Sequence, residues 1–293
     1  MNLYDYNTIN RILSSHGFTF SKALGQNFLI DSSVCPRMAE SLNADEKTGV
    51  IEVGPGIGVL TKELSKVCGR VVSIELDKRL PAVLAETLSD CKNVKIVEGD
   101  VMKMDLKKLI SENFSDMNSV KVCANLPYYI TSPVIMTLLE SGLDIDEIVV
   151  MVQKEAAQRL CAEVGTRDSG AVTVAVSYYA EPQVLFSVGR ESFYPSPNVD
   201  SAVIKLSLRK EPAVAVKDEK TFFSVVKCGF AQRRKTLLNS LSNTMGIKKQ
   251  LVSEALKKAQ LAENIRMEKL TMEQLASLSD IIFEMKSGEK NEG

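Results

Sequence analysis

Histidine and tryptophan are nearly missing from this sequence. Its 293 residues include a single histidine, His16, and no tryptophan, and its six cysteines stand more than twenty residues apart with no Cys-x-x-Cys pair. A structural zinc site needs clustered cysteine or histidine ligands, so we expect no metal. A histidine-dependent catalytic triad would have to use His16 alone. Dispersed cysteines in a chain of this length, without an export signal, are expected to be reduced and buried.

Long apolar runs are missing as well. No run approaches the roughly 20 residues needed to span a bilayer, and the N-terminal stretch MNLYDYNTIN lacks the apolar core of an export signal. We therefore expect a cytoplasmic, soluble protein with no membrane partner, and we expect it to be a monomer. The chain also lacks an excess of either charge, because 36 lysines and arginines are balanced by 37 acidic residues and the net charge is −1. Taken over the whole chain, this balance argues against a nucleic-acid partner, which usually meets a basic surface.

Between Gly49 and Gln153, short apolar runs alternate with helical patterns. Helical periodicity occupies residues 60–67 and 79–88. The apolar runs are rich in valine and isoleucine and nearly continuous, which is typical of parallel strands covered on both faces. They are residues 50–53, 71–76, 94–99, 120–125 and 148–153. The alternation predicts an α/β domain with a parallel, doubly wound sheet.

The chain changes character near residue 209, and its length suggests two domains. VDSAVIKLSL (199–208) follows a proline-rich loop and predicts a last strand at the edge of the sheet. The polar stretch 209–220 contains a proline, has no clear period and predicts a domain boundary. Residues 221–286 have a helical pattern throughout, and the tail 287–293 is expected to be disordered. The predicted domains are therefore residues 1–208 and a smaller, all-helical domain at 209–293.

Three glycines lie within five residues where the first of these strands meets the first of these helices, in EVGPGIG (52–58). Glycines there permit a tight turn and let backbone amides approach a ligand at the helix N-terminus. The segment therefore favours a nucleotide-like ligand over a plain strand–helix turn. The dinucleotide fingerprint would place a small residue at position 59, where this sequence has Val59, so a pyrophosphate ligand is disfavoured.

Acidic residues follow the next two strands. Glu75 ends the second strand, where an acid can accept hydrogen bonds from both ribose hydroxyls of an adenosine-containing cofactor. The alternative for Glu75 is a solvated carboxylate, which the neighbouring Asp77 makes reasonable. Asp100 ends the third strand, where a carboxylate could accept from an adenine amine. Because ligands of open α/β sheets bind along the carboxyl edge, the glycine loop and these two acids predict one adenosine site.

NLPYYITSP (125–133) ends the fourth strand, beside the expected reactive end of the cofactor. Asn125 offers a side-chain carbonyl, Leu126 a backbone carbonyl without a ladder partner, and Tyr128 a flat aromatic face. The exocyclic amine of a base is a poor nucleophile because its lone pair is delocalised into the ring. Two acceptors that hold its hydrogens would favour a pyramidal nitrogen while the base stacks on Tyr128, without any histidine or cysteine. The segment also fits a proline turn that starts a helix, with Ser132 as N-cap and a proline at the first helical position.

A set of motifs resembles the rRNA adenine-N6 dimethyltransferases, a family of Rossmann-like enzymes that use S-adenosylmethionine. The motifs are GQNFL (25–29), EVGPGIGVLT (52–61), IELD (74–77), EGD (98–100), NLPYYI (125–130) and FYPSPNVDSAV (193–203). They follow the family's order, and FAQRRKTLLNSL (230–241) is similar to the branch that dimethylates two adjacent adenines in a hairpin loop near the 3′ end of small-subunit rRNA. The resemblance implies a methyltransferase sheet with a smaller helical domain, acting on the small ribosomal subunit or its precursor.

The resemblance also implies which residues bind the cofactor. Asn27 and Leu29 would close over S-adenosylmethionine from the N-terminal segment, and Gly54 would approach its methionine part. Glu75 would hold the ribose and Asp100 the adenine amine.

The resemblance places the target adenine at the fourth strand. Asn125 would stand between the cofactor and the target amine, with the Leu126 carbonyl as a second acceptor. Tyr128 would stack on the adenine, and Phe193 would be a second aromatic wall. Core packing is the alternative for Phe193.

Basic residues gather in one stretch. Between Lys220 and Ser253 there are seven lysines and arginines and no acid, which leaves 29 basic residues against 37 acids elsewhere. Such a cluster can neutralise RNA phosphates and position a substrate without reading its sequence. We expect Arg233, Arg234 and Lys235 to bind RNA, although a solvated helix face would have the same composition.

Three other functions stay open. The branch of the family that methylates large-subunit rRNA and confers macrolide resistance is the nearest competitor. A non-catalytic ribosome-assembly or RNA-binding factor would depend mainly on the basic helical domain. A nicotinamide-dependent oxidoreductase on the same fold is disfavoured by Val59 and by the lack of a plausible proton donor.

Overall fold

The computed structural model of the chain describes residues 1–17 and 27–291, and it consists of two compact units. Each unit has its own apolar core and is built from two segments of the chain. The first unit contains Met1–Ala157 and Glu181–Leu208, and the second contains Gln158–Ala180 and Arg209–Gly293.

The segment 158–180 differs from the domain division expected from the sequence. The first unit ends at Leu208, where the polar stretch begins, but 158–180 packs with the C-terminal helices instead of the sheet. Helix α8 (Ala171–Tyr179) explains this, because its Val174 and Tyr178 are buried in the helical core. The Tyr178 ring stacks on Phe222 with 5.1 Å between ring centroids.

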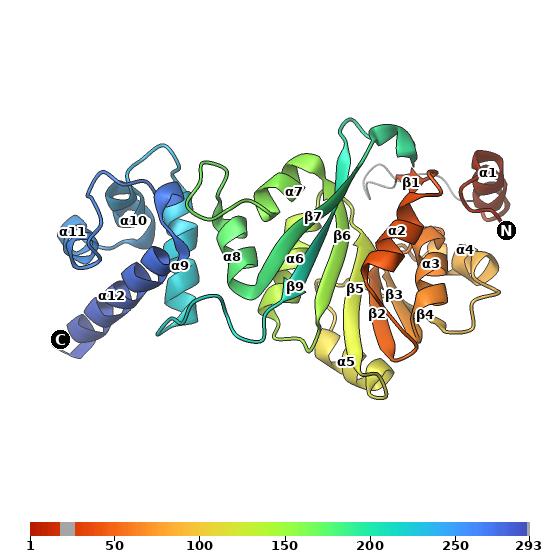
Figure 1. The fold of residues 1–293 in the computed structure, drawn as a ribbon, viewed down its shortest axis with the longest axis horizontal. Coiled ribbons are helices and arrows are strands. Elements are labelled where there is room, and N and C mark those ends of the chain that lie inside the picture. Colours follow the sequence, from red (N-terminus) through yellow and green to blue (C-terminus); the bar gives the residue numbers. More distant parts are fainter. Residues whose placement is uncertain (18–26, 292–293) are drawn as a thin grey trace. The chain divides into compact units, whose positions relative to one another are not determined.

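A seven-stranded sheet forms the first unit (Figure 1). The five strands predicted from the Val/Ile-rich runs are confirmed, and neighbouring strands among them run parallel. They are β2 (Thr48–Val53), β3 (Arg70–Glu75), β4 (Val94–Glu98), β5 (Ser119–Asn125) and β6 (Glu147–Gln153). The order across the sheet is β4-β3-β2-β5-β6-β9-β7.

Strand β9 (Ser201–Leu208) is not the edge strand that the sequence predicts. It lies antiparallel to β6, with Ser201 opposite Gln153, and between β6 and a further strand, β7 (Ala180–Val188). The sheet is therefore mixed: the five predicted strands run parallel, as expected, and β9 adds a strand that is antiparallel to β6. Strand β7 contains Pro182 and four exposed positions, as is usual at an edge, so it lacks the continuous apolar run that identified the other strands.

Helices connect the strands of the first unit. The patterns at 60–67 and 79–88 are confirmed as α3 (Val59–Val67) and α4 (Leu80–Thr87). The other helices of this part of the chain are α1 (Tyr6–Ser15), α2 (Val34–Ser41), α5 (Leu106–Phe114), α6 (Thr131–Glu140), α7 (Lys154–Leu160) and the short turn Arg190–Ser192.

Helix α6 begins earlier than the sequence predicts. Its N-cap is Ile130, so Ser132 lies inside the first turn and the prediction of Ser132 as N-cap is wrong. The carbonyl of Pro127 accepts hydrogen bonds from the Ile130 amide at 3.1 Å and from the Thr131 hydroxyl at 3.3 Å. Because of these two bonds, the turn after β5 continues directly into the helix.

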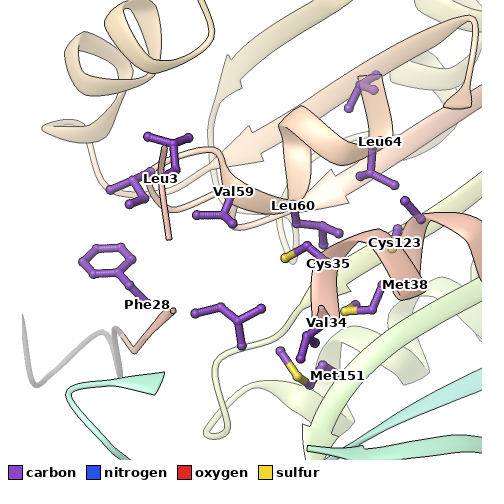
Figure 2. Packing of buried hydrophobic residues seen from close by; sticks show 14 of the residues in the cluster. Leu3, Phe28, Val34, Cys35, Met38, Val59, Leu60, Leu64, Cys123 and Met151 are labelled. Atoms are coloured by element: carbon purple, nitrogen blue, oxygen red, sulfur yellow. The ribbon is translucent and has the colours of Figure 1, made fainter. Parts of the chain in front are cut away.

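The core on one face of the sheet is formed with α2 and α3, which lie across the near face of the sheet in Figure 1. Figure 2 shows Cys35 and Met38 of α2 and Leu60 of α3 gathered with Cys123 and Met151 of the strands. All five side chains are buried. At β2, β3, β5 and β6 the opposite face of the sheet is buried as well, which accounts for the mostly apolar sequences of these strands.

A buried ionic group joins the end of α2 to the sheet. The Glu147 carboxylate pairs with Lys121, at 3.2 Å, and with Lys205, and both lysines are largely buried. Their ammonium groups also donate to the carbonyls of Leu42 and Ser41 at the end of α2. The two lysines thus satisfy carbonyls that the helix end leaves unpaired.

Two short strands bring distant segments of the chain together. Strand β1 (Phe28–Leu29) pairs antiparallel with β8 (Phe193–Tyr194), so that Leu29 lies opposite Phe193. The N-terminal segment therefore meets the loop that precedes β9, beside the carboxyl edge of the large sheet.

The second unit is helical, as predicted. Phe222, Val225 and Leu241 lie in its core, which fits the apolar periodicity of the sequence. Helix α12 continues to Asn291, so residues 287–291 of the tail that was expected to be disordered are helical. The helices after α8 are α9 (Glu219–Phe230), α10 (Leu237–Met245), α11 (Lys249–Lys258), the short turn Met267–Lys269 and α12 (Met272–Asn291). In the described ranges, no helix combines the length and apolarity required to cross a membrane.

Candidate active site

The carboxyl edge of the sheet borders one open pocket to which all nine predicted catalytic and cofactor-binding residues contribute. The strand order reverses between β2 and β5, and open α/β sheets bind ligands at such a switch point. The empty volume of the pocket, counted out to its mouth, is about 1170 Å³. Side chains or backbone from positions 27 to 193 therefore face one space. They are Asn27, Leu29, Gly54, Glu75, Asp100, Asn125, Leu126, Tyr128 and Phe193.

The turn after β2 consists of glycines with left-handed backbone angles. Gly54, Gly56 and Gly58 have φ of +71°, +59° and +90°, which residues with a Cβ adopt only with strain. The Gly54 amide donates to the Ile74 carbonyl at 2.9 Å and ties the turn to β3. A Cβ at Gly54 would meet open space, whereas one at Gly58 would come within 2.9 Å of Leu88. Gly54 therefore brings bare backbone to the pocket, and Gly58 permits close packing behind it.

Glu75, the last residue of β3, is a buried carboxylate, only 6% exposed. The alternative of a solvated strand-end acid is therefore wrong. Burial raises the pKa of Glu75, and hydrogen bonds from the backbone amides of Asp77, Gly56 and Leu76 partly oppose this effect. The Asp77 amide donates to Glu75 Oε1 at 2.6 Å, while the Asp77 carboxylate pairs with Arg79 at 2.6 Å. Asp77 is thus paired with Arg79, and of these two acids Glu75 is the one that lines the pocket.

Asp100 lies two residues beyond the end of β4, slightly further than the sequence suggests. The Met102 amide donates to its Oδ1 at 3.0 Å, and Lys103 lies 3.6 Å from its Oδ2. Its side chain is partly exposed, so the carboxylate borders both the pocket and solvent.

Asn125 and Leu126, at the end of β5, both line the pocket. Asn125 is the last residue of β5, and Leu126 follows with a buried side chain and an amide that donates to the Met151 carbonyl at 3.3 Å. The next carbonyl, that of Pro127, is occupied by the Ile130 amide. The Asn125 side chain and the Leu126 backbone therefore lie where the strand ends and the turn begins.

Tyr128 is held by its hydroxyl, which shares a hydrogen bond of 2.8 Å with Ser201 at the start of β9. Burial raises the pKa of Tyr128, and the bond to Ser201 partly opposes this effect, so the phenol is neutral at physiological pH. The ring is half-buried and lines the pocket. Its orientation is set by an atom 73 residues away in the sequence.

Phe193 packs in the core, as its alternative predicted, and it also lines the pocket. It is 3% exposed, belongs to the same apolar cluster as Leu29, and lies opposite Leu29 in the β1–β8 pair. Asn27 precedes β1 and is half-buried at the pocket wall. The pairing of β1 with β8 thus places the N-terminal motif beside the proline-rich motif.

The sequence reasoning missed Glu52, an acid within β2 that also lines the pocket. It is 1% exposed, and the hydroxyls of Thr61 and Ser73 both donate to its Oε2 at 2.6 Å. Burial raises the pKa of Glu52 to about 7, against the opposing effect of these two hydroxyls. The sequence did contain a signal, because an acid inside an apolar strand is unusual and costs free energy unless it is hydrogen-bonded.

Three further residues inside the predicted motifs received no role from the sequence. Phe28, Leu76 and Tyr129 line the pocket. Each directly adjoins a residue to which the sequence did assign a role.

The cysteines are all free, and Cys35, Cys68 and Cys123 are buried. Burial raises the pKa of the Cys35 thiol, the one cysteine that lines the pocket, so that it stays protonated. Over residues 1–17 and 27–291, no three histidines, cysteines or acids gather in a group that could hold a metal ion.

The three basic residues expected to bind RNA differ in their surroundings. Arg233 donates to the carbonyls of Arg167 and Ser169 at 2.8 and 3.1 Å and lies 3.7 Å from Glu268. It is therefore partly engaged in holding the helical unit together. Arg234 and Lys235 are exposed at the turn between α9 and α10.

Comparison with known proteins gives a family. Residues 17–284 match the model of the family described as ribosomal RNA adenine dimethylase. The protein named ribosomal RNA small subunit methyltransferase A from Bacillus licheniformis is 47% identical over 277 residues, covering 94% of this chain and 95% of its own. The protein of the same name from Geobacillus thermodenitrificans is 48% identical over 275 residues, covering 93% and 94%.

Solved structures agree with the sequence matches. The structure of 23S rRNA methyltransferase ErmE has a TM-score of 0.65 at 27% identity, covering 87% of this chain and 99% of its own. A dimethyladenosine transferase from Plasmodium falciparum has the same fold, with a TM-score of 0.71 at 23% identity, covering 89% and 98%. With the match to the family model over most of its length, the chain belongs to the ribosomal RNA adenine dimethylase family.

Proposed function

We propose that this chain transfers methyl groups from S-adenosylmethionine to N6 of two adjacent adenines in a hairpin loop near the 3′ end of small-subunit rRNA. Relatives that carry the small-subunit name match it at 47–48% identity over more than nine-tenths of its length, against 27% for the 23S enzyme. The observation that carries the proposal is one pocket lined by Glu75, Asn125 and Tyr128. The product would be a modified small subunit, and the reaction a step in its biogenesis.

The pocket fits S-adenosylmethionine. The bare backbone of Gly54 leaves open space for the methionine part, and the buried Glu75 is an acceptor suited to ribose hydroxyls. Asp100 would accept from the adenine amine, and Asn27 and Leu29 would cover the cofactor from the N-terminal segment. The bound cofactor supplies an electrophilic methyl group.

The chain's own residues would prepare the target nitrogen. The Asn125 side-chain carbonyl and the Leu126 backbone carbonyl would accept the two hydrogens of the adenine amine, which favours a pyramidal nitrogen with a free lone pair. Tyr128, fixed by Ser201, would stack on one face of the base, and Phe193 would bound it on another side. After methyl transfer the nitrogen is positively charged and loses its proton to water. No general base is needed, and a second transfer requires room around the nitrogen once the first methyl group is in place.

RNA would meet the helical unit through its basic stretch. Between Lys220 and Ser253 the chain carries seven basic residues and no acid, and Arg234 and Lys235 are exposed. Phosphate contacts of this kind position the substrate. We propose that the protein acts as a monomer in the cytoplasm, where a small-subunit precursor would present the unpaired loop from which a base can leave its stack.

Radiolabelled S-adenosylmethionine and separated, unmodified ribosomal subunits test the substrate. We expect label in N6-dimethyladenosine of the small subunit. Label in the large subunit would move the assignment to the macrolide-resistance branch. Tight binding of NAD without binding of S-adenosylhomocysteine would instead indicate the oxidoreductase.

The Asn125→Ala variant tests the mechanism. We expect it to bind S-adenosylhomocysteine but to lose methylation of unmodified small subunits. Unchanged methylation would show that the mechanism is wrong. If the inactive variant still associates with small-subunit precursors, the chain also has an assembly role that does not depend on catalysis.

A further inference from the structure

Large apolar side chains are exposed along the carboxyl edge of the sheet, around the pocket. In the described part of the chain seven such side chains are exposed, and three of them lie beyond the carboxyl ends of strands: Leu76 directly after β3, Met102 four residues after β4, and Tyr129 four residues after β5. Tyr129 is the largest of the three and is 54% exposed, although it lines the same pocket as Tyr128. Apolar surface gathered at the rim of a pocket indicates a binding surface more than scattered exposure does.

The backbone fixes Tyr129 firmly. The Pro127 carbonyl accepts from the Ile130 amide at 3.1 Å, which closes a turn whose two central residues are Tyr128 and Tyr129. The Thr131 hydroxyl donates to the same carbonyl at 3.3 Å. One turn therefore presents two aromatic rings. The Tyr128 ring is half-buried and anchored through its hydroxyl, and the Tyr129 ring lies in solvent at the mouth.

We propose that Tyr129 stacks on the base next to the target adenine, a role that rests on the proposed function of the pocket. When a base leaves its stack, the face of its neighbour loses a stacking partner. An aromatic side chain at the mouth of the pocket can replace that partner, because every base offers a face to stack on. A tyrosine loses little conformational freedom in doing so, since only two side-chain torsions must be fixed.

On a substrate with two adjacent target adenines, stacking on Tyr129 would affect which bases the protein holds. While one adenine is held against Tyr128, the base on Tyr129 is the other target or the base on its far side. Tyr129 would therefore set how far the strand enters the pocket. It acts on the RNA through the neighbouring base and does not touch the reacting nitrogen, so it is a positioning residue.

Two substitutions of Tyr129 test the proposal, with unmodified small subunits as substrate. Tyr129→Ala is expected to lower kcat/KM for subunits by roughly 10- to 100-fold, mainly through KM, with KM for S-adenosylmethionine unchanged. Tyr129→Phe keeps the ring and is expected to restore kcat/KM to within about threefold of the wild-type value. Equal losses in the two variants would assign the effect to the hydroxyl and overturn the proposal, as would an alanine variant within threefold of wild type.

A change in the substrate separates stacking from a structural effect of the substitution. Subunits reconstituted with rRNA that lacks the base beside the target adenine should be poorer substrates for the wild type. On these subunits Tyr129→Ala should cause no further loss beyond about threefold, and an undiminished loss would overturn the proposal. Failure of the underlying function is distinguishable, because the wild type itself would then leave unmodified small subunits unlabelled.

Discussion

The hydrogen bond between Tyr128 and Ser201 holds the ring on which the target base would stack, and we expect its loss to slow methylation modestly. The two oxygens are 2.8 Å apart. Ser201 is fully buried at the start of β9, opposite Gln153 of β6, whereas Tyr128 is half-buried. Tyr128→Phe removes the bond and keeps the ring, and Ser201→Ala removes the bond from the other side.

The magnitude follows from the net contribution of one hydrogen bond, about 1 kcal/mol. If all of it positions the ring, each variant loses about fivefold in rate, because 1.4 kcal/mol corresponds to a factor of ten. The effects on stability should differ. Tyr128→Phe leaves the buried Ser201 hydroxyl without this partner, which should lower the free energy of unfolding by about 1–3 kcal/mol. In the Ser201→Ala variant the Tyr128 hydroxyl is half-buried and can reach water, so the loss of stability should be smaller.

Single-turnover methylation of unmodified small subunits at saturating S-adenosylmethionine measures the rate, and urea unfolding measures stability. The double variant should be no slower than either single variant, because both single changes remove the same bond. Multiplying rate losses would contradict a shared bond. A loss of about 1000-fold in Tyr128→Phe alone would exceed one hydrogen bond and refute the positioning role, because the hydroxyl would then act on the substrate directly.

Burial raises the pKa of Glu52 from 4.5 to about 7, so its contribution to stability is complete below about pH 4.5 and is lost as the pH rises to about 7. Glu52→Gln should remove this loss and gain on the order of 3 kcal/mol relative to wild type between pH 4.5 and 8 in urea unfolding; a difference independent of pH would contradict the assignment. Glu147→Gln leaves two buried lysines without their counter-charge and should cost about 3–5 kcal/mol in the same assay, against less than about 0.5 kcal/mol for Glu254→Gln in an exposed pair. Gly58→Ala should cost about 1–3 kcal/mol more than Gly246→Ala, because both have positive φ but only Gly58 has a neighbour that a Cβ would strike; equal thermal shifts would show that packing around Gly58 relaxes freely.

The fold was predictable wherever local pattern and final burial agree. Four of the five parallel strands, β2, β3, β5 and β6, are mostly apolar because both faces are covered, so the sequence of each one shows its environment, whereas β4 at the edge is only partly buried. Strand β7 is half exposed and contains Pro182, so nothing local distinguishes it from a loop. The segment 158–180 was misassigned for a related reason, since apolar residues such as Val174 show that they are buried but not in which core.

The site residues were predictable from their order along the chain. Glycines, acids and the Asn125–Tyr128 segment each stand at the end of a strand, and parallel strands bring their carboxyl ends to one edge. Glu52 was missed because it lies inside a strand. A buried acid there needs hydrogen-bond donors, which Thr61 and Ser73 supply, and the sequence does not show which residues will be these donors.

By itself, the sequence determined the parallel part of the sheet and the edge of the sheet at which the ligand site lies. It also determined that a net charge near zero is unevenly distributed along the chain. These features could be predicted because strand patterns, glycine turns and the order of the motifs can be recognised directly along the sequence. Only the tertiary structure decided that Ser201 anchors Tyr128, that Leu29 pairs with Phe193, and that Arg233 is tied to backbone carbonyls of its own unit. These contacts join residues tens to more than a hundred positions apart, and such pairings are decided by how the packed elements meet and not by the residues next to each partner.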